Sequence, residues 1–166
     1  MRCTLERVQQ KLTRGRYEMT DYTVRPWTRD DLPKIFLAEK ECFSDPWTEQ
    51  MIKSEFTKPI FCGFVLEEKG VLAGYICGTA LFEDGEIPKV AVLPDFRRKG
   101  YGKKLVDTVI ADLQTRGVER IFLEVREKNL PAVALYQGCG FVTVRIRKQY
   151  YPDGENALEM KKELLP

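Results

Sequence analysis

The sequence predicts an α/β domain in which helices flank a mixed sheet. In the first half of the chain, apolar runs of strand length follow one another across short turns, as in antiparallel sheet. In the second half, strand, helix, strand, helix and strand alternate, an order that requires at least one parallel crossover. The 166 residues, 43% apolar and 31% charged, are enough to bury roughly 70% of the unfolded surface around one core.

Two helices and four strands are expected in the first half. Thr28 is a good N-cap, and Asp30 and Asp31 fall in the first turn of the helix that follows it. The Ser-Asp-Pro-Trp-Thr segment at 44–48 separates this helix from a second one, which ends before Pro59. We expect strands at 22–27, 60–67, 71–82 and 87–93, and helices at 28–43 and from the 44–48 break to Pro59.

The longest helix is expected in the second half, from Gly100 or Gly102 to Arg116. Gly117 fits the left-handed position that ends many helices. A Pro-Asp-Gly turn at 152–154 precedes the last strand. The other elements are strands at 118–125, 141–146 and 157–161 and a short helix at 131–138. One face of the long helix is apolar and consists of Leu105, Val106, Val109, Ile110 and Leu113.

The small positive charge of the chain, 27 basic against 25 acidic residues, comes from its first 18 residues. Without them the chain has one more acidic than basic side chain, which gives little support to a nucleic-acid-binding domain. We expect residues 1–21 to be an N-terminal extension, disordered or a short helix with Leu5, Val8 and Leu12 on one weak face, ahead of a domain at 22–166. Met19 is a candidate original start, and a functional basic arm is the alternative.

The five cysteines are scattered, with no Cys-x-x-Cys pair, and form neither a disulfide framework nor a four-ligand metal spacing. This pattern indicates a reducing, cytoplasmic setting. The longest uncharged stretch, residues 70–82, is too short to span a bilayer, and the head of the chain lacks the apolar core of a secretory signal. We therefore expect no membrane partner and no metal. The oligomeric state stays open.

The chain contains no histidine. A Ser-His-Asp triad, a Cys-His dyad and a histidine zinc site are therefore excluded. Any catalysis must use carboxylates, tyrosine, cysteine, lysine or main-chain groups.

A basic turn with two glycines connects the strand at 87–93 to the longest helix. Gly100 and Gly102 let main-chain N–H groups approach a ligand, and the helix dipole favours an anion there. Five cationic side chains between residues 97 and 104 strengthen that field, so a diphosphate is the natural occupant. The alternative is a basic helix cap on a solvated face. The turn is neither a P-loop nor the full G-x-G-x-x-G fingerprint.

The pattern Arg97-x-x-Gly100-x-Gly102 resembles the Q/R-x-x-G-x-G/A coenzyme A signature of the GNAT acyltransferase family. Further matches to that domain follow in order: Leu-Glu-Val-Arg at 123–126, Asn129, Ala-Leu-Tyr at 134–136 and Gly-Phe at 140–141. Within the family, segments 45–49, 123–126 and 147–154 are similar to the RimI-type enzymes, which acetylate the N-terminal alanine of a small-subunit ribosomal protein. The likeness covers about residues 22–162.

This resemblance implies the GNAT fold, a mostly antiparallel mixed sheet with a parallel pair at the coenzyme cleft, and acetyl-CoA as co-substrate without a metal. Glu124 matches the general base and Tyr136 the general acid. The implied coenzyme contacts are the main chain of Val90, Ala91 and Val92 for the pantetheine arm, the turn formed by Arg97, Arg98, Lys99, Gly100, Tyr101, Gly102 and Lys103 for the diphosphate, and Asn129 beside the reaction centre. The implied acceptor contacts are Trp47, Tyr150 and Tyr151.

An α-amino acceptor suits these groups. With a pKa of about 7.7–8.0, roughly a tenth of it is neutral at pH 7, against about a two-thousandth of a lysine with a pKa near 10.4. The difference corresponds to roughly 3.4 kcal/mol. A carboxylate, directly or through a water, can take the remaining proton, and a tyrosine hydroxyl near the sulfur can stabilise the thiolate.

Each candidate also fits a purely structural role. Glu124 fits a salt-bridged carboxylate on the rim of a strand, and Tyr136 fits a core aromatic. Tyr150 and Tyr151 fit an exposed hairpin pair. Cys139, between two glycines and without a histidine base, is expected to be a small packing residue and not a nucleophile.

The sequence thus predicts a cytoplasmic N-terminal acetyltransferase that transfers the acetyl group directly, in a ternary complex, to a protein N-terminus. A ribosomal protein is the expected partner, without direct nucleic-acid contact. The alternatives are the same catalyst acting on lysine side chains or a small amine, a non-catalytic acyl-CoA-binding module, and an RNA binder that uses the basic turn. Pro88 and Lys89 stand where family members often carry Asn or His, a departure that concerns substrate specificity.

Overall fold

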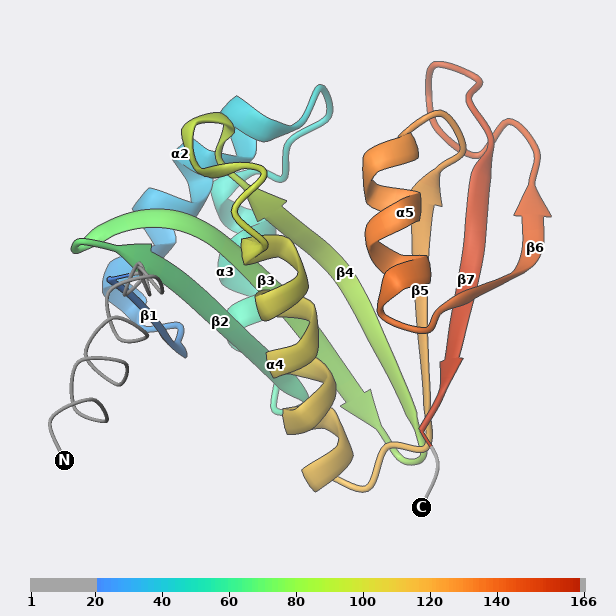
Figure 1. Ribbon diagram of the computed structural model, residues 1–166, viewed down its shortest axis with the longest axis horizontal. Helices are drawn as coiled ribbons and strands as arrows, with labels where there is room; N and C mark the ends of the chain where they lie inside the picture. Colours follow the sequence, from blue (N-terminus) through green and yellow to red (C-terminus); the bar gives the residue numbers. More distant parts are fainter. Residues whose placement is uncertain (1–20, 165–166) are drawn as a thin grey trace, which may run out of the picture.

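The computed structural model describes residues 21–164, which contain seven strands and four α-helices (Figure 1). The strands are β1 (Tyr22–Pro26), β2 (Phe61–Glu68), β3 (Val71–Leu81), β4 (Asp84–Val92), β5 (Arg120–Arg126), β6 (Val142–Arg147) and β7 (Ala157–Glu163). The helices are α2 (Leu32–Cys42), α3 (Glu49–Phe56), α4 (Tyr101–Thr115) and α5 (Leu130–Gly138), with 3-10 turns η1 (Arg29–Asp31) and η2 (Pro94–Phe96). Each strand and helix predicted within this range is found within a few residues of its expected bounds.

The strands form one sheet in the order β1-β2-β3-β4-β5-β7-β6. Neighbouring strands are antiparallel except β4 and β5, which are parallel and are connected through α4. The predicted mixed sheet with a parallel pair is therefore confirmed. The weak helical face at Leu5, Val8 and Leu12 lies outside the described residues, as does all of the expected extension at 1–21 except Asp21.

Helices cover both faces of the sheet, with α4 and α5 on one face and α2 and α3 on the other (Figure 1). The apolar face predicted for α4 is confirmed: Ile110 is partly buried and the other four side chains are fully buried in the core beneath α4 and α5. The opposite face has its own core, centred on Trp27, Ile35 and Tyr75. The sheet thus separates two packed layers, and an opening between its strands would connect them.

Gly117 ends α4 as predicted. Its φ is +85°, and the Val118 N–H donates to Leu113 O at 3.2 Å while the Gly117 N–H donates to Gln114 O at 3.1 Å. These two bonds satisfy the last carbonyls of the helix. The strand predicted from residue 118 begins instead at Arg120, because Val118 completes the end of α4.

The first predicted helix is divided in two. Thr28 is the N-cap, but the turn after it, η1, is a 3-10 turn, and the α-helix starts only at Leu32. The Asp31 carboxylate accepts from the Thr28 N–H at 2.7 Å and from the Arg25 guanidinium at 2.8 Å, which holds this turn against β1. The prediction of one helix over 28–43 was wrong in this detail: Pro33 lies in the first turn of α2, a position that proline favours at the start of an α-helix.

The parallel strands β4 and β5 pair at one end only. Their register runs from Asp84 opposite Arg120 to Glu86 opposite Phe122 and then stops. On its other side β4 carries a bulge, where residues 87 and 88 lie opposite the single residue Gly78 of β3. Because Pro88, in this bulge, has no N–H, it cannot donate a hydrogen bond to a neighbouring strand. Beyond Glu86 and Phe122, β4 and β5 separate.

Candidate active site

A cleft of about 1390 Å³ opens where β4 and β5 separate. Its walls come from the loop between α2 and α3, from β4, the turn before α4, β5, α5 and the loop between β6 and β7. Of the site residues predicted from the sequence, Lys99 alone is absent from this lining. The cleft brings together Trp47, Val90, Ala91, Val92, Arg97, Arg98, Gly100, Tyr101, Gly102, Lys103, Glu124, Asn129, Tyr136, Tyr150 and Tyr151.

The open edge of β4 presents main-chain groups to the cleft. Successive residues of a strand direct their N–H and C=O groups to opposite edges. The Leu93 N–H donates to Ala73 O of β3 at 2.9 Å, so the main chain of Ala91 also faces β3. The main-chain groups of Val90 and Val92 therefore face the cleft, where an extended amide-containing arm could pair with them.

The N-terminus of α4 forms the adjoining wall. Gly100, at φ +80°, is its N-cap, so no side chain within residues 21–164 caps the N–H groups of the first turn. A Cβ added to Gly102 would lie 3.1 Å from Leu135 Cδ2, which leaves little room for a larger residue. A helix end of this kind fits an anion such as a diphosphate.

Three cations of the basic turn are engaged by protein groups. Main-chain N–H groups of the turn and the Arg98 side chain, which lines the cleft, can meet an anion without breaking these three contacts. A patch that relied on these side chains for nucleic acid would first have to break the contacts. The three contacts join Lys99 Nζ to the Glu68 carboxylate (2.8 Å), Lys103 Nζ to Asp107 Oδ2 (2.6 Å) and Arg97 Nε to Val92 O (2.9 Å).

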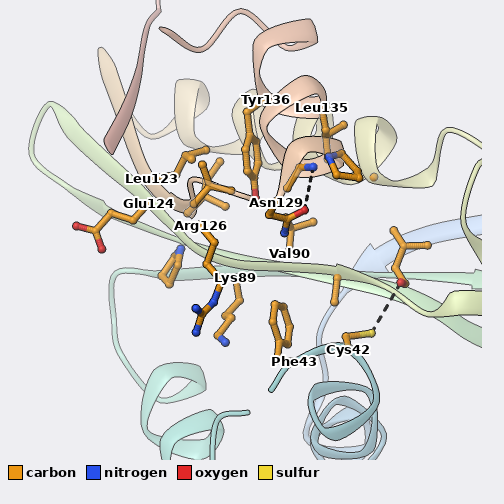
Figure 2. Close-up of a pocket in the computed structure, with 18 of the residues that line it drawn as sticks. Cys42, Phe43, Lys89, Val90, Leu123, Glu124, Arg126, Asn129, Leu135 and Tyr136 are labelled. Carbon is orange, nitrogen blue, oxygen red and sulfur yellow. Dashed lines mark hydrogen bonds between the residues drawn. The ribbon is translucent and has the colours of Figure 1, made fainter. Parts of the chain in front are cut away.

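Glu124 and Tyr136 reach the cleft from opposite faces of the sheet. Leu123 and Val125 of β5 are buried in the core beneath α4 and α5, so Glu124 between them points to the other face. Tyr136 packs in that same core. Figure 2 shows Tyr136 extending from α5 into the cleft while Glu124 leaves β5 in a different direction. A thioester between the strands would have a carboxylate on one side and a phenol on the other.

The Tyr136 hydroxyl stays protonated at neutral pH. Tyr136 is 6% exposed, its ring centroid lies 5.9 Å from that of Phe141, and burial raises the pKa of Tyr136 above its ordinary value. An ordinary thiol has a pKa of about 8.5, so complete proton transfer from Tyr136 to a thiolate is unfavourable. The arrangement fits a hydrogen-bond donor to the thiolate better than a full proton donor.

Asn129 is the N-cap of α5. Its Oδ1 accepts from the Ala132 N–H at 3.2 Å, the contact drawn beside Asn129 in Figure 2. The side-chain oxygen is therefore used within the protein. Because Asn129 also lines the cleft, its Nδ2 group is the one it can offer to a coenzyme.

Glu124 lies in a charged network at the other side of the cleft. Its side chain is 29% exposed, and its Oε1 lies 3.1 Å from Arg147 Nη1. A hydrogen bond with Glu124 raises the pKa of Tyr150. Glu124 is thus a salt-bridged carboxylate, as one interpretation expected, and it also lines the cleft.

Arg126 of β5 joins the two loops that carry Trp47, Tyr150 and Tyr151. Its guanidinium lies 3.9 Å from the centre of the Tyr151 ring, and burial raises the pKa of Tyr151 to about 12. The Tyr150 and Tyr151 ring centroids are 5.2 Å apart, edge to face. The predicted acceptor residues therefore form one connected wall. Arg126 makes ion pairs with Asp45 (3.5 Å) of one loop and with Asp153 (2.7 Å) and Glu155 (3.0 Å) of the other.

A buried carboxylate beneath this wall was not found from the sequence. Glu39 of α2 is fully buried; its side chain accepts from the Trp47 N–H at 2.7 Å and from the Tyr75 hydroxyl, and lies 3.5 Å from Lys89 Nζ. Lys89 in turn lies 3.9 Å from the centre of the Phe43 ring. The sequence predicted that Lys89, which departs from the family pattern, brings a positive charge toward the cleft. No local sequence pattern identifies Glu39 as the partner of Lys89.

Cysteine and metal chemistry find little support in the part of the chain described here. Cys139 is 8% exposed, and burial raises the pKa of its thiol, as expected of a packing residue. Burial also raises the pKa of Cys42, which lines the cleft. No group of three or more His, Cys, Asp or Glu side chains within residues 21–164 is placed to hold a metal ion. None of the helices in this range is long and apolar enough to cross a membrane.

Comparison with known proteins gives consistent matches. The model of the acetyltransferase (GNAT) family matches residues 16–141. The [ribosomal protein bS18]-alanine N-acetyltransferase of Escherichia coli (strain K12) is 33% identical over 141 residues, which cover 83% of this chain and 95% of that protein. The enzyme of the same name from Haemophilus ducreyi is 36% identical over 135 residues, 78% of this chain and 92% of that protein.

Solved structures agree with these sequence matches. The crystal structure of the ribosomal-protein-S18-alanine N-acetyltransferase from Escherichia coli superimposes with a TM-score of 0.82 at 32% identity, covering 87% of this chain and 95% of that one. The structure of Ard1 from Thermoplasma volcanium also gives 0.82, at 26% identity, with coverage of 88% and 99%.

Proposed function

The chain belongs to the GNAT acetyltransferase family, and from this premise we propose that it is a cytoplasmic enzyme that acetylates the N-terminal α-amino group of a protein. The acceptor we propose is the N-terminal alanine of ribosomal protein bS18, for which the relatives from Escherichia coli and Haemophilus ducreyi are named. The observation that carries the proposal is the position of Glu124 and Tyr136, which line one cleft from opposite faces of the sheet beside an uncapped helix N-terminus.

Acetyl-CoA fits the half of the cleft between β4 and α4. The main-chain groups of Val90 and the N–H of Val92 are positioned for the amides of the pantetheine arm, whereas Val92 O already accepts from Arg97 Nε. The first turn of α4 is positioned for the diphosphate. Asn129 and Tyr136 line the cleft near the thioester end of that path. The predicted contact of Ala91 is a packing contact in this proposal, since its main chain faces β3.

The transfer proceeds by direct attack. The neutral α-amine attacks the thioester carbonyl carbon, a C–N bond forms and the C–S bond breaks. Glu124, directly or through a water, takes the proton lost by the amine, and Tyr136 donates a hydrogen bond to the departing thiolate. Burial raises the pKa of both Cys42 and Cys139, which supports a ternary complex over an acetyl-cysteine intermediate.

A peptide panel with acetyl-CoA tests this function. Three peptides are compared by mass spectrometry: one with a free N-terminal alanine and no lysine, one with a blocked N-terminus and lysines, and one with both groups. We expect acetylation of the first and third, at the N-terminus only. Acetylation of the blocked peptide together with no reaction on the lysine-free one would mean a lysine acetyltransferase, and coenzyme binding without any turnover would mean a non-catalytic module.

The variant Glu124→Gln tests the proposed base in the same assay. It keeps the size of the side chain and removes the base, so we expect turnover of the lysine-free peptide to fall roughly 100-fold. Because the coenzyme contacts are on β4, α4 and α5, the KM for acetyl-CoA should change little. Turnover equal to that of the parent protein would exclude Glu124 as the base.

A further inference from the structure

The proposed base has a second carboxylate beside it. Glu124 of β5 and Glu159 of β7 are register partners in the antiparallel pair, so their side chains lie on the same face of the sheet. Both line the cleft, and they are 29% and 19% exposed. Two like charges placed directly opposite each other repel, and protonation of one of them relieves the repulsion.

Arg147 of β6 bridges the two carboxylates. Its Nη1 lies 3.1 Å from Glu124 Oε1 and its Nε lies 2.9 Å from Glu159 Oε2. The guanidinium also lies 5.4 Å from the centre of the Tyr150 ring, and Tyr150 is hydrogen-bonded to Glu124. The ion pair holds the Glu124 carboxylate toward β6, on the side of the loop that carries the predicted acceptor residues.

The other charged groups near Glu124 have partners of their own. Lys89 is paired with Glu39, and Arg126 with three carboxylates of the flanking loops. Within residues 21–164, the salt bridge with Arg147 is the one ion pair that Glu124 makes. The titratable and charged groups that face this region are Asp45 of the α2–α3 loop, Glu86 and Lys89 of β4, Arg126 of β5, Arg147 of β6, Glu159 and Lys161 of β7, and Tyr150 and Tyr151 of the β6–β7 loop, with Lys161 paired to Glu163.

We propose that Arg147 is a positioning residue that neutralises Glu159 and orients the Glu124 carboxylate as the base. The proposal rests on the proposed function, because it assumes that Glu124 accepts the proton of the acceptor amine. Ionised Glu124, Glu159 and Arg147 together carry a charge of −1. Loss of Arg147 leaves −2 on the two adjacent carboxylates, and the further loss of Glu159 restores −1. Arg147 acts through Glu124 and does not itself touch the reacting atoms.

Titration of Glu124 tests this role without requiring activity. Carboxyl carbon NMR on the full chain labelled with ¹³C-glutamate follows Glu124, whose resonance is assigned by its loss in Glu124→Gln. In Arg147→Gln we expect the titration midpoint to rise by about one pH unit. Adding Glu159→Gln should reverse most of that rise, and Arg147→Lys should largely prevent it. The matched control is Lys148→Gln, which removes one positive charge from the neighbouring exposed residue and should leave the midpoint unchanged.

Kinetics on the lysine-free peptide provide the second readout. In Arg147→Gln, kcat/KM relative to the parent protein should be lower at pH 5 than at pH 8.5, and Glu159→Gln should restore the activity lost at pH 5. A midpoint in Arg147→Gln that matches that of Lys148→Gln, or a shift that Glu159→Gln fails to reverse, would overturn the proposal. If the midpoint shifts as expected but neither the parent protein nor any variant acetylates a peptide N-terminus, the charge coupling of Arg147, Glu124 and Glu159 stands, and the proposed function and the role of Glu124 as its base fail.

Discussion

At the scale of single residues, the proposed site pairs a buried phenol, Tyr136, with a salt-bridged carboxylate, Glu124, in a chain without histidine. Burial raises the pKa of Tyr136, which keeps its hydroxyl a donor, whereas Glu124 is partly exposed and is held by a guanidinium. An α-amine that is already partly neutral at pH 7 needs only a weak base. The absence of histidine from the sequence is therefore compatible with this reaction, in which the acceptor amine itself titrates near neutrality and no protein side chain has to.

The hydroxyl of Tyr136 should contribute to turnover and not to folding. In Tyr136→Phe the ring can keep its contact with Phe141, but the hydrogen bond to the departing thiolate is lost. Removing one such donor costs about 100-fold in kcat, while the KM values for peptide and acetyl-CoA should change little. Steady-state kinetics with the lysine-free peptide measure this, with a thermal melt as the control for stability. An unchanged kcat would mean that another group stabilises the thiolate.

Some carboxylates in and beneath the cleft could be predicted from the sequence and others could not. Glu124 and Tyr136 were proposed because they match a family motif, and the structure places both at the cleft. Glu39 and Glu159 belong to no motif. Each is distinguished by an ion pair with a residue of another element, Glu39 with Lys89 and Glu159 with Arg147. A pairing of this kind depends on how strands and helices are placed, which local sequence patterns do not contain.

At the scale of elements, the turn into α4 is the part of the site whose function depends most on backbone geometry. Gly100 adopts a left-handed conformation, and Gly102 lies against Leu135 of α5. A side chain at position 102 would therefore press on α5 beside the N–H groups proposed for the diphosphate.

A larger side chain at Gly102 should weaken coenzyme binding. In Gly102→Val the added carbons would push against Leu135, since even a Cβ would lie 3.1 Å from it. We expect the dissociation constant for acetyl-CoA, measured by calorimetry, to rise about tenfold, which corresponds to about 1.4 kcal/mol. The matched control is Gly138→Val on α5, where nothing lies within 4 Å of an added Cβ. Equal affinities in the two variants would show that this contact does not shape the coenzyme site.

Elements were predicted well where their signal is local. The face of α4 and its end at Gly117 follow from spacing and from one glycine, and both were found as expected. The 3-10 turn after Thr28 and the separation of β4 from β5 were not predicted as such. The first has a local marker, Pro33 at the start of α2, that the prediction did not use, and the second accompanies a bulge whose position is defined only against β3.

At the scale of the whole molecule, the two ends of the sheet carry separate charged networks. One end of the sheet carries β6 and β7, which contribute Arg147 and Glu159 to the site. At the other end, Arg25 of β1 holds Asp31 of η1 at 2.8 Å and Glu67 of β2 at 2.9 Å. This second network lies outside the cleft lining, so its contribution to stability can be measured separately from catalysis.

The Arg25–Asp31 pair should make the stability of the fold depend on acid pH. Hydrogen bonds from Arg25 lower the pKa of Asp31 to about 2, and Asp31 is 2% exposed. A lowered pKa in the folded state means that the stabilisation is complete above about pH 4, the unfolded value, and is lost as the pH falls toward 2. Urea unfolding should show that Asp31→Asn lowers the free energy of unfolding by about 2 kcal/mol at pH 7 and by about half as much at pH 3. The exposed neighbour Asp30 serves as the control, since Asp30→Asn should change little at either pH. A loss in Asp31→Asn that is the same at pH 3 and pH 7 would mean that the ionised form of Asp31 contributes nothing, and that the carboxyl acts only through its hydrogen bonds to Thr28.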